Sequence, residues 1–192
     1  MVDWALFGFV FFGLFSPGPN VILLTRSGAQ FGVGPTLPHV FGVVVGVGII
    51  AGVTAAGIGA LLAANPTLTF ALRVIAACWI AFMAYRLWTA DPGAVQSGDR
   101  PFTFPEAVLF QAVNPKLWAV CLSAMAFVAD LPVSQQVQVM AATFSGLNFL
   151  VCFFWTLTGG LLSYLLREPA AWKLFNRIMS AGLAVFAILV FL

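Results

Sequence analysis

Charged residues are scarce in this sequence. Asp, Glu, Lys and Arg make up 7% of its 192 residues, whereas soluble domains carry roughly 25%. A compact soluble globule of this length cannot cover its surface with so few charges, and 62% of the residues are hydrophobic, with 20 Phe among them. The composition therefore predicts an integral membrane protein whose surroundings are mostly lipid.

Other scarcities argue against whole classes of function. The net charge is +2 without any basic run, so nucleic acid is not an expected partner. The cysteines, Cys78, Cys121 and Cys152, form no C-x-x-C pair, which argues against a disulfide framework or a zinc site. There is one histidine, His39, and no pair of carboxylates or nucleophile with its base. We therefore expect no enzyme activity, cofactor or metal ion.

Long apolar windows occupy most of the chain. Crossing a bilayer core takes about 20 apolar residues in a helix. The N-terminus has Asp3 in place of the basic start of a signal peptide, so we count it as the beginning of a span. Six windows qualify: 4–25, 39–63, 68–88, 106–129, 137–166 and 173–192. The sequence predicts one all-α transmembrane domain over residues 1–192, with loops at Gly32, Gly34, Pro35 and Pro38 and at Asn65-Pro66.

The polar stretch 91–105 divides the six windows into two halves, 1–90 and 106–192. Because each half has three spans, the second half must be inserted upside down, which gives an inverted 3+3 repeat. Lys and Arg gather at the inner ends of membrane helices. With both termini outside, the inside holds six of them and the outside holds Arg73 alone; the six are Arg26, Arg86, Arg100, Arg167, Lys173 and Arg177.

Two of the windows are interrupted by proline. The first contains Ser16-Pro17-Gly18-Pro19-Asn20, and the fourth contains Asn114-Pro115-Lys116. Proline removes a backbone donor and clashes with the preceding turn, so both helices should break or kink there. Backbone groups freed within a membrane must face protein or a water-filled cavity, and half-helix ends suit an ionic solute. We therefore expect a binding site for a polar solute, although kinks with a purely structural role are the alternative.

Further polar residues lie within the apolar windows. Lys116 either binds a substrate carboxylate, bonds to carbonyls freed by a break, or extends toward the membrane surface. Asn148 belongs to a stripe at helical spacing that faces either the site or a neighbouring helix; its members are Ser145, Asn148, Cys152, Thr156, Gly159 and Ser163. His39 is either a proton relay or, as we favour, a structural histidine near the inner surface. Gly42-x-x-x-Gly46 and Gly48-x-x-x-Gly52 favour close helix packing over substrate contact.

At these motifs the sequence resembles the LysE/RhtB family of amino-acid exporters. The residues that carry the resemblance are Ser16-Pro-Gly-Pro-Asn20 and Asn114-Pro-Lys116, with weaker support from the Gly42-x-x-x-Gly46 spacing, Ala76-Ala-Cys-Trp-Ile80 and Tyr85-Arg-Leu-Trp88. The resemblance implies a carrier in the bacterial inner membrane that exports amino acids or related metabolites. It also implies exchange with an ion, for which a proton and sodium are both candidates, and a homo-oligomer is an open alternative.

One departure from the family pattern bears on the substrate. Where many relatives have an acidic residue after the second glycine of the second span, this chain has Val47. A cationic substrate side chain then has no acidic partner deep in the membrane, which favours neutral amino acids. We expect the substrate at Pro17, Gly18, Pro19, Asn20, Asn114, Pro115, Lys116 and Asn148. The alternative is a passive channel or an assembly subunit without a saturable carrier cycle.

Overall fold

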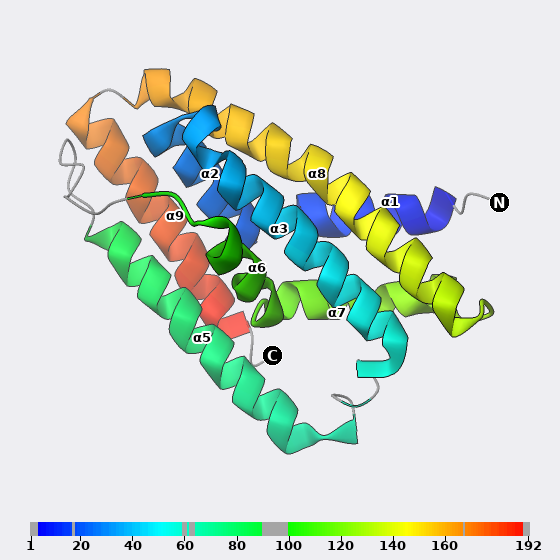
Figure 1. Cartoon of the computed structure of the whole chain (residues 1–192). Helices are drawn as coiled ribbons and strands as arrows, with labels where there is room; N and C mark the ends of the chain where they lie inside the picture. Colours follow the sequence, from blue (N-terminus) through cyan, green and yellow to red (C-terminus); the bar gives the residue numbers. More distant parts are fainter. Residues whose placement is uncertain are drawn as a thin grey trace.

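In a computed structural model of the chain, the described residues are 4–16, 18–58, 61, 64–89, 100–166 and 168–189. Over these residues the secondary structure is helical, without a strand. The elements in chain order are α1 (Trp4–Phe15), α2 (Pro19–Phe31), α3 (Val33–Val53), η1 (Thr54–Ile58), α5 (Pro66–Trp88), α6 (Phe104–Ala112), α7 (Pro115–Ala124), η2 (Met125–Phe127), α8 (Val133–Leu165) and α9 (Pro169–Leu189) (Figure 1).

The helices follow the predicted windows in order. Within the described residues, four continuous stretches are long and apolar enough to cross a membrane, namely α3 with η1, α5, α8 and α9. Two bent pairs, α1 with α2 and α6 with α7, raise the total to six spans if each pair counts as one. The all-helical, multi-span class is thus confirmed, whereas the mirrored relation of the two halves remains a prediction.

Both predicted breaks are present. The axes of α1 and α2 differ by 58°, and those of α6 and α7 by 63°. In each pair the second helix begins with proline, at Pro19 and at Pro115. Proline is favoured at the first helical position because its missing N–H has no partner there and its fixed φ suits the helix. Each break is therefore followed by a proline that starts the second helix of the pair.

The predicted loop after the first span is wrong in extent. The chain leaves the helical path at Gly32, where φ is 83°, and α3 already begins at Val33. Pro35 lies in the first turn, where a missing backbone donor costs nothing, and Pro38 lies inside the helix four residues after Gly34. The second span therefore starts six residues earlier than the predicted window.

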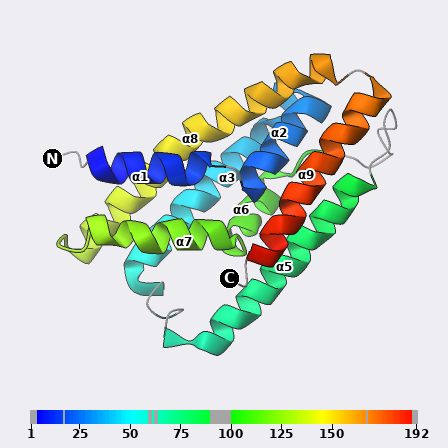
Figure 2. The same cartoon turned by 180° about the vertical axis from the view of Figure 1, so that it is seen from behind.

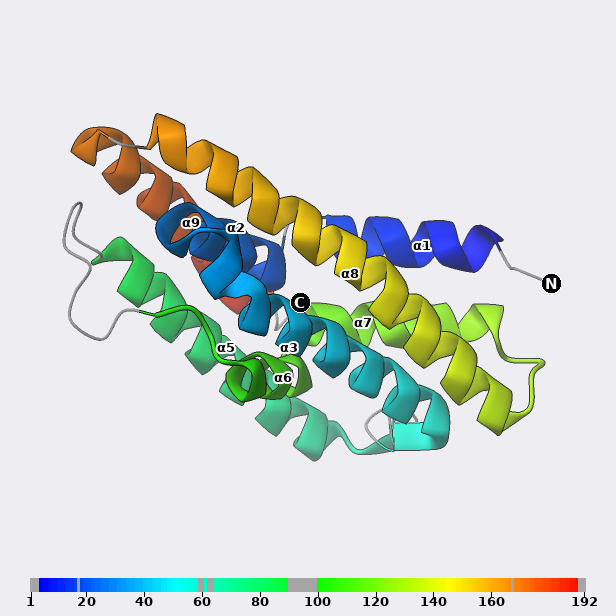
Figure 3. The ribbon, with the colours of Figure 1, turned by 45° about the horizontal axis from the view of Figure 1, so that its top comes forward.

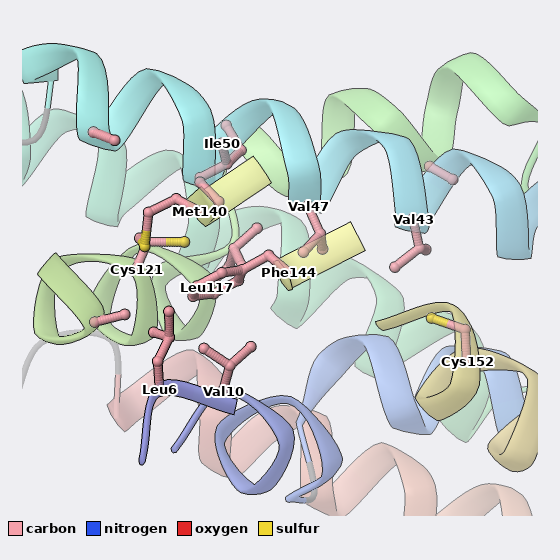
Figure 4. Packing of buried hydrophobic residues seen from close by; sticks show 14 of the residues in the cluster. Leu6, Val10, Val43, Val47, Ile50, Leu117, Cys121, Met140, Phe144 and Cys152 are labelled. Atoms are coloured by element: carbon pink, nitrogen blue, oxygen red, sulfur yellow. The ribbon is translucent and has the colours of Figure 1, made fainter. Parts of the chain in front are cut away.

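The centre of the fold is formed by α3 and α8, which pack along each other. Both of them also contact the broken spans, since α8 packs on α1 and α2 while α3 packs on α2, α6 and α7. Figures 2 and 3 show α1 beside α7 at one end of the molecule, and α5 beside α9 along another side. Buried apolar side chains from α1, α3, α7 and α8 fill the space between these helices (Figure 4); they include Val10, Val47, Leu117 and Phe144.

Glycines allow the closest contacts between helices. Gly28 of α2 faces the Thr156 carbonyl of α8, and Gly159 of α8 faces the Thr25 carbonyl of α2, so any side chain at either position meets backbone. Gly42 of α3 faces α6 in the same way. The predicted packing role of the small-residue spacing is therefore confirmed.

Candidate functional site

A cavity of about 20 Å³ lies where the two broken spans meet. It is lined by residues of α1, α2, α7 and α8 and by the residues at the breaks. A volume of this size holds about one water molecule. The structure thus has a small, nearly filled space at the position where the sequence predicts a binding site.

Most of the predicted site residues line this cavity. They are Gly18, Pro19 and Asn20 from the first break, Asn114 and Lys116 from the second, and Asn148 from α8. Pro115 starts α7 but is not part of the cavity wall. Pro17 lies outside the described residues. Two breaks that are almost a hundred residues apart in sequence are therefore brought to one point.

The N-terminal ends of two helices face the cavity. Gly18 and Asn114 are the N-caps of α2 and α7, and both line the cavity. No side chain caps either end by a hydrogen bond. The first amides of a helix carry partial positive charge, so two such ends and the Lys116 ammonium give the cavity a positive potential.

The carbonyls freed at the two breaks are satisfied in parallel ways by α7. Lys116 Nζ donates to the Ser16 carbonyl at the end of α1, at 2.5 Å. Trp118 Nε1 donates to the Ala112 carbonyl at the end of α6, at 2.8 Å. Lys116 therefore bonds to a carbonyl freed by a break, which is one of the three roles considered for it.

Side-chain amides connect the two breaks directly. Asn20 Nδ2 donates to Gln111 Oε1 at 2.8 Å, and Gln111 Nε2 donates to Asn20 Oδ1 at 3.1 Å. Gln111 is fully buried and also donates to the Ala107 carbonyl of its own helix at 3.0 Å. Asn114 Nδ2 lies 3.4 Å from Gln111 Oε1. These bonds fix α2 relative to α6 at the point where α2 begins and α6 ends.

Two buried polar atoms of the cavity wall have no hydrogen-bond partner among the described residues. They are Oδ1 of Asn114, an acceptor, and Nδ2 of Asn148, a donor, and each side chain is 3% exposed. A buried unpaired polar atom costs about 1–3 kcal/mol, so such atoms usually have a partner in the functional state. A ligand with both a donor and an acceptor would satisfy the pair.

The rest of the wall is apolar, with Leu14, Leu24, Leu117, Val120 and Val151 among its members. No acidic side chain lines the cavity. Of the predicted stripe on α8, Asn148 and Cys152 reach the cavity, whereas Ser145 donates to the Val44 carbonyl of α3 at 3.2 Å. The stripe therefore faces the cavity at Asn148 and Cys152 and a neighbouring helix at Ser145. Among the described residues, no group of three His, Cys, Asp or Glu could hold a metal ion.

Gln111 and Trp118 are absent from the site predicted from sequence. An amide within an apolar window, three residues before the second break, is the signal for Gln111. Nothing in the sequence alone indicates that Asn20 is its partner, because that pairing depends on how α2 and α6 pack. The bond of Trp118 to a freed carbonyl likewise requires knowledge of the bend between α6 and α7.

Comparison with known proteins agrees with this architecture. The LysE type translocator family matches residues 11–192, which is nearly the whole chain. No curated protein and no solved structure gives a significant match. The matched region includes both breaks, the end of α1 and the whole of α2, α7 and α8. The chain therefore belongs to the LysE type translocator family, and it is a multi-pass membrane transporter of a small molecule.

Proposed function

We propose that the protein is a secondary carrier that exports neutral amino acids across the bacterial inner membrane. The observation that carries the proposal is the meeting of two helix breaks at one cavity with a lysine and two unpaired amide atoms in its wall. Broken helices at the interface of two halves are typical binding sites of secondary transporters.

The groups of the cavity suit a zwitterion. The two helix N-termini and the Lys116 ammonium favour a carboxylate, and Asn148 Nδ2 supplies a further donor. Asn114 Oδ1 is an acceptor for the ammonium group of the same molecule. We infer that the carboxylate replaces the Ser16 carbonyl as the partner of Lys116, since both are oxygen acceptors.

The apolar wall favours a substrate with an apolar side chain. Leu14, Leu117 and Val120 offer a surface for aliphatic groups, and the wall has no carboxylate to pair with a cationic side chain. Lysine and arginine are therefore disfavoured as substrates. Leucine, valine and alanine are the compounds to test first.

The small volume favours a carrier over a pore. A space for about one water molecule does not admit an amino acid, so the broken spans must separate before a substrate can bind. A carrier binds its substrate in one open state, closes around it and opens to the other side. A passive pore needs a continuous polar lining, whereas this wall is mainly apolar.

Counterflow in proteoliposomes tests the proposal. Purified protein is reconstituted with unlabelled L-leucine inside, and the uptake of radiolabelled L-leucine is measured against its external concentration. We expect saturable uptake that external valine inhibits and lysine does not, with empty liposomes as the control. Flux that rises linearly with concentration would indicate a pore, and absence of flux with leucine, valine and alanine would contradict the proposed substrate class.

A further inference from the structure

His39 lies in an unusual environment for the single histidine of a membrane protein. It sits on α3, six residues after the helix begins, with 1% of its surface exposed. Its Nδ1 is 3.4 Å from Ser27 Oγ of α2, and its ring lies on Phe102, with the ring centroids 5.0 Å apart. Its Nε2 is buried and has no hydrogen-bond partner among the described residues.

An unpartnered imidazole nitrogen is chemically open to a proton. If Nδ1 accepts from Ser27, Nε2 carries an N–H without an acceptor, and if Nδ1 donates, Nε2 offers an unused lone pair. After protonation both nitrogens are donors, and Nε2 then requires an acceptor. The neutral histidine fits the present state, and the protonated one requires a rearrangement around it.

The charged residues around His39 are few. Glu106 of α6 is the residue whose charge acts on the imidazole. Its carboxylate binds Arg100 at 2.6 and 2.7 Å and accepts from the backbone and hydroxyl of Thr103 at 2.8 and 2.9 Å. The bonds from Glu106 raise the pKa of the Arg100 guanidinium. The charge of Glu106 favours a protonated His39, and in this structure the Glu106 carboxylate is bound to Arg100.

The other elements packed against α3 offer no competing charge. On α2, Arg26 lies next to Ser27 but donates from Nε to Asn176 of α9 at 3.2 Å. The helix α8 carries no Asp, Glu, Lys, Arg or His. The one charged residue of α7 is Lys116, at the cavity. The remaining titratable groups of α7 and α8 are Cys121, Cys152 and Tyr164.

One short helix connects this histidine to the cavity. His39, Gly42 and Gly46 lie on the same face of α3, since they are three and four residues apart. A Cβ at Gly42 would meet Phe104 and Ala107 of α6, and one at Gly46 would meet Val108 and Gln111. Five residues separate Glu106 from Gln111, which is about 7.5 Å along the helix axis. A shift of α6 at its Glu106 end therefore also displaces Gln111 and its bonds to Asn20.

We propose that His39 carries the coupling proton of the transport cycle and that α6 transmits its protonation to the substrate cavity. This inference rests on the proposed carrier function. In the present state His39 is neutral, Glu106 is bound to Arg100, and the Asn20–Gln111 pair holds the breaks together. Protonation draws Glu106 from Arg100 toward Nε2, moves α6 and loosens the amide pair. One proton then enters the cell for each substrate released from it.

The first test compares two modes of transport in the same proteoliposomes. The probe is radiolabelled L-leucine, driven either by counterflow or by an imposed pH gradient. We expect His39→Gln, and His39→Asn as a smaller substitute, to keep counterflow and to lose accumulation driven by the gradient. Phe41→Leu, at an exposed position of the same helix, should keep both. Gradient-driven accumulation by His39→Gln, or accumulation that follows a sodium gradient instead, would overturn the inference.

The second test does not depend on any substrate. Because His39 is the one histidine in the chain, histidine labelled with ¹⁵N in the ring gives an isolated NMR signal set from protein purified with a histidine-free tag. We expect the ring to take up a proton as the pH is lowered over the range in which the protein stays folded. Glu106→Gln should move that transition toward lower pH, because the stabilising carboxylate is lost. A ring that stays neutral over this range, or a transition that Glu106→Gln leaves unchanged, contradicts the inference.

The two tests separate the possible failures. If the unmodified protein shows no counterflow of leucine, valine or alanine while His39 titrates as expected, the proposed substrate class fails and the proton site stands. If counterflow is present and saturable but His39→Gln behaves like the unmodified protein under a pH gradient, the carrier function stands and the role of His39 is refuted.

Discussion

Asn20 and Gln111 bond to each other in both directions, at 2.8 and 3.1 Å, although 91 residues separate them in the sequence. Each residue lies at a helix break, so the amide pair joins the two halves of the chain at the candidate site. Each amide is the hydrogen-bond partner of the other, so both bonds must break before α2 and α6 can separate around a substrate.

Removing one partner of this pair should destabilise the protein. In Asn20→Ala the buried Gln111 amide loses two bonds, and an unpaired buried polar group costs about 1–3 kcal/mol. The double variant Asn20→Leu with Gln111→Leu replaces both amides of the pair by apolar groups. It also removes the Gln111 bond to the Ala107 carbonyl and the 3.4 Å contact with Asn114 Nδ2, so part of the stability should return while transport stays absent. Thermal unfolding in detergent and leucine counterflow measure the two effects. Equal stability of the single and double variants would show that the amide pair is energetically unimportant.

Lys116 should distinguish substrate binding from helix stabilisation. Lys116→Met keeps the length of the side chain but removes both the bond to Ser16 and the charge for a carboxylate. We expect it to insert in the membrane and to lose saturable leucine counterflow. Lys116→Arg keeps a charge and should retain part of the activity. Full counterflow by Lys116→Met, at normal amounts of inserted protein, would exclude Lys116 from the site.

The contact between α2 and α8 should tolerate no added side chain. Gly159 faces the Thr25 backbone, and overpacking of this kind costs typically about 1–3 kcal/mol. Gly159→Ala should therefore lower the unfolding temperature. The matched control is Gly146→Ala on the same helix, where no atom lies within 4 Å of the added Cβ. If the two variants unfold at the same temperature, the close contact of α2 with α8 is not maintained in the membrane.

The distribution of Lys and Arg predicts the orientation of the chain. Placing both termini outside assigns Arg26, Arg86 and Arg100 to the inside and leaves Arg73 as the basic residue outside. Alkaline phosphatase and green fluorescent protein, fused in turn after residue 97, report the two possible locations. We expect fluorescence and no phosphatase activity from this position. Phosphatase activity there would invert the topology.

Much of the fold could be predicted because its signals are local. Hydropathy alone indicates the spans, since each helix must be apolar over its own length. Pro19 and Pro115 mark the breaks because proline acts on the turn that contains it. The sequence predicts the start of α3 too late because Pro35 and Pro38 are typical of loops, although the first turn of a helix accepts proline.

The site could be predicted only in part, because its remaining features depend on packing between distant segments. Asn20, Asn114 and Lys116 were identified from motifs next to the breaks. The bond from Lys116 to Ser16, the bond from Trp118 to Ala112 and the partner of Gln111 arise from the bends of 58° and 63°. Hydropathy and periodicity do not encode these angles. The burial of His39 likewise depends on Phe102 and α6.

The central claim is that the substrate occupies the cavity between the two breaks. Protection from thiol labelling measures this directly: Val120, in the cavity wall on α7, is changed to Cys after Cys78, Cys121 and Cys152 are replaced by Ser or Ala. We predict that L-leucine slows the reaction of this thiol with a maleimide in a saturable way and that L-lysine does not. Saturable leucine transport by a protein whose Val120→Cys thiol reacts at the same rate with and without leucine would contradict the account.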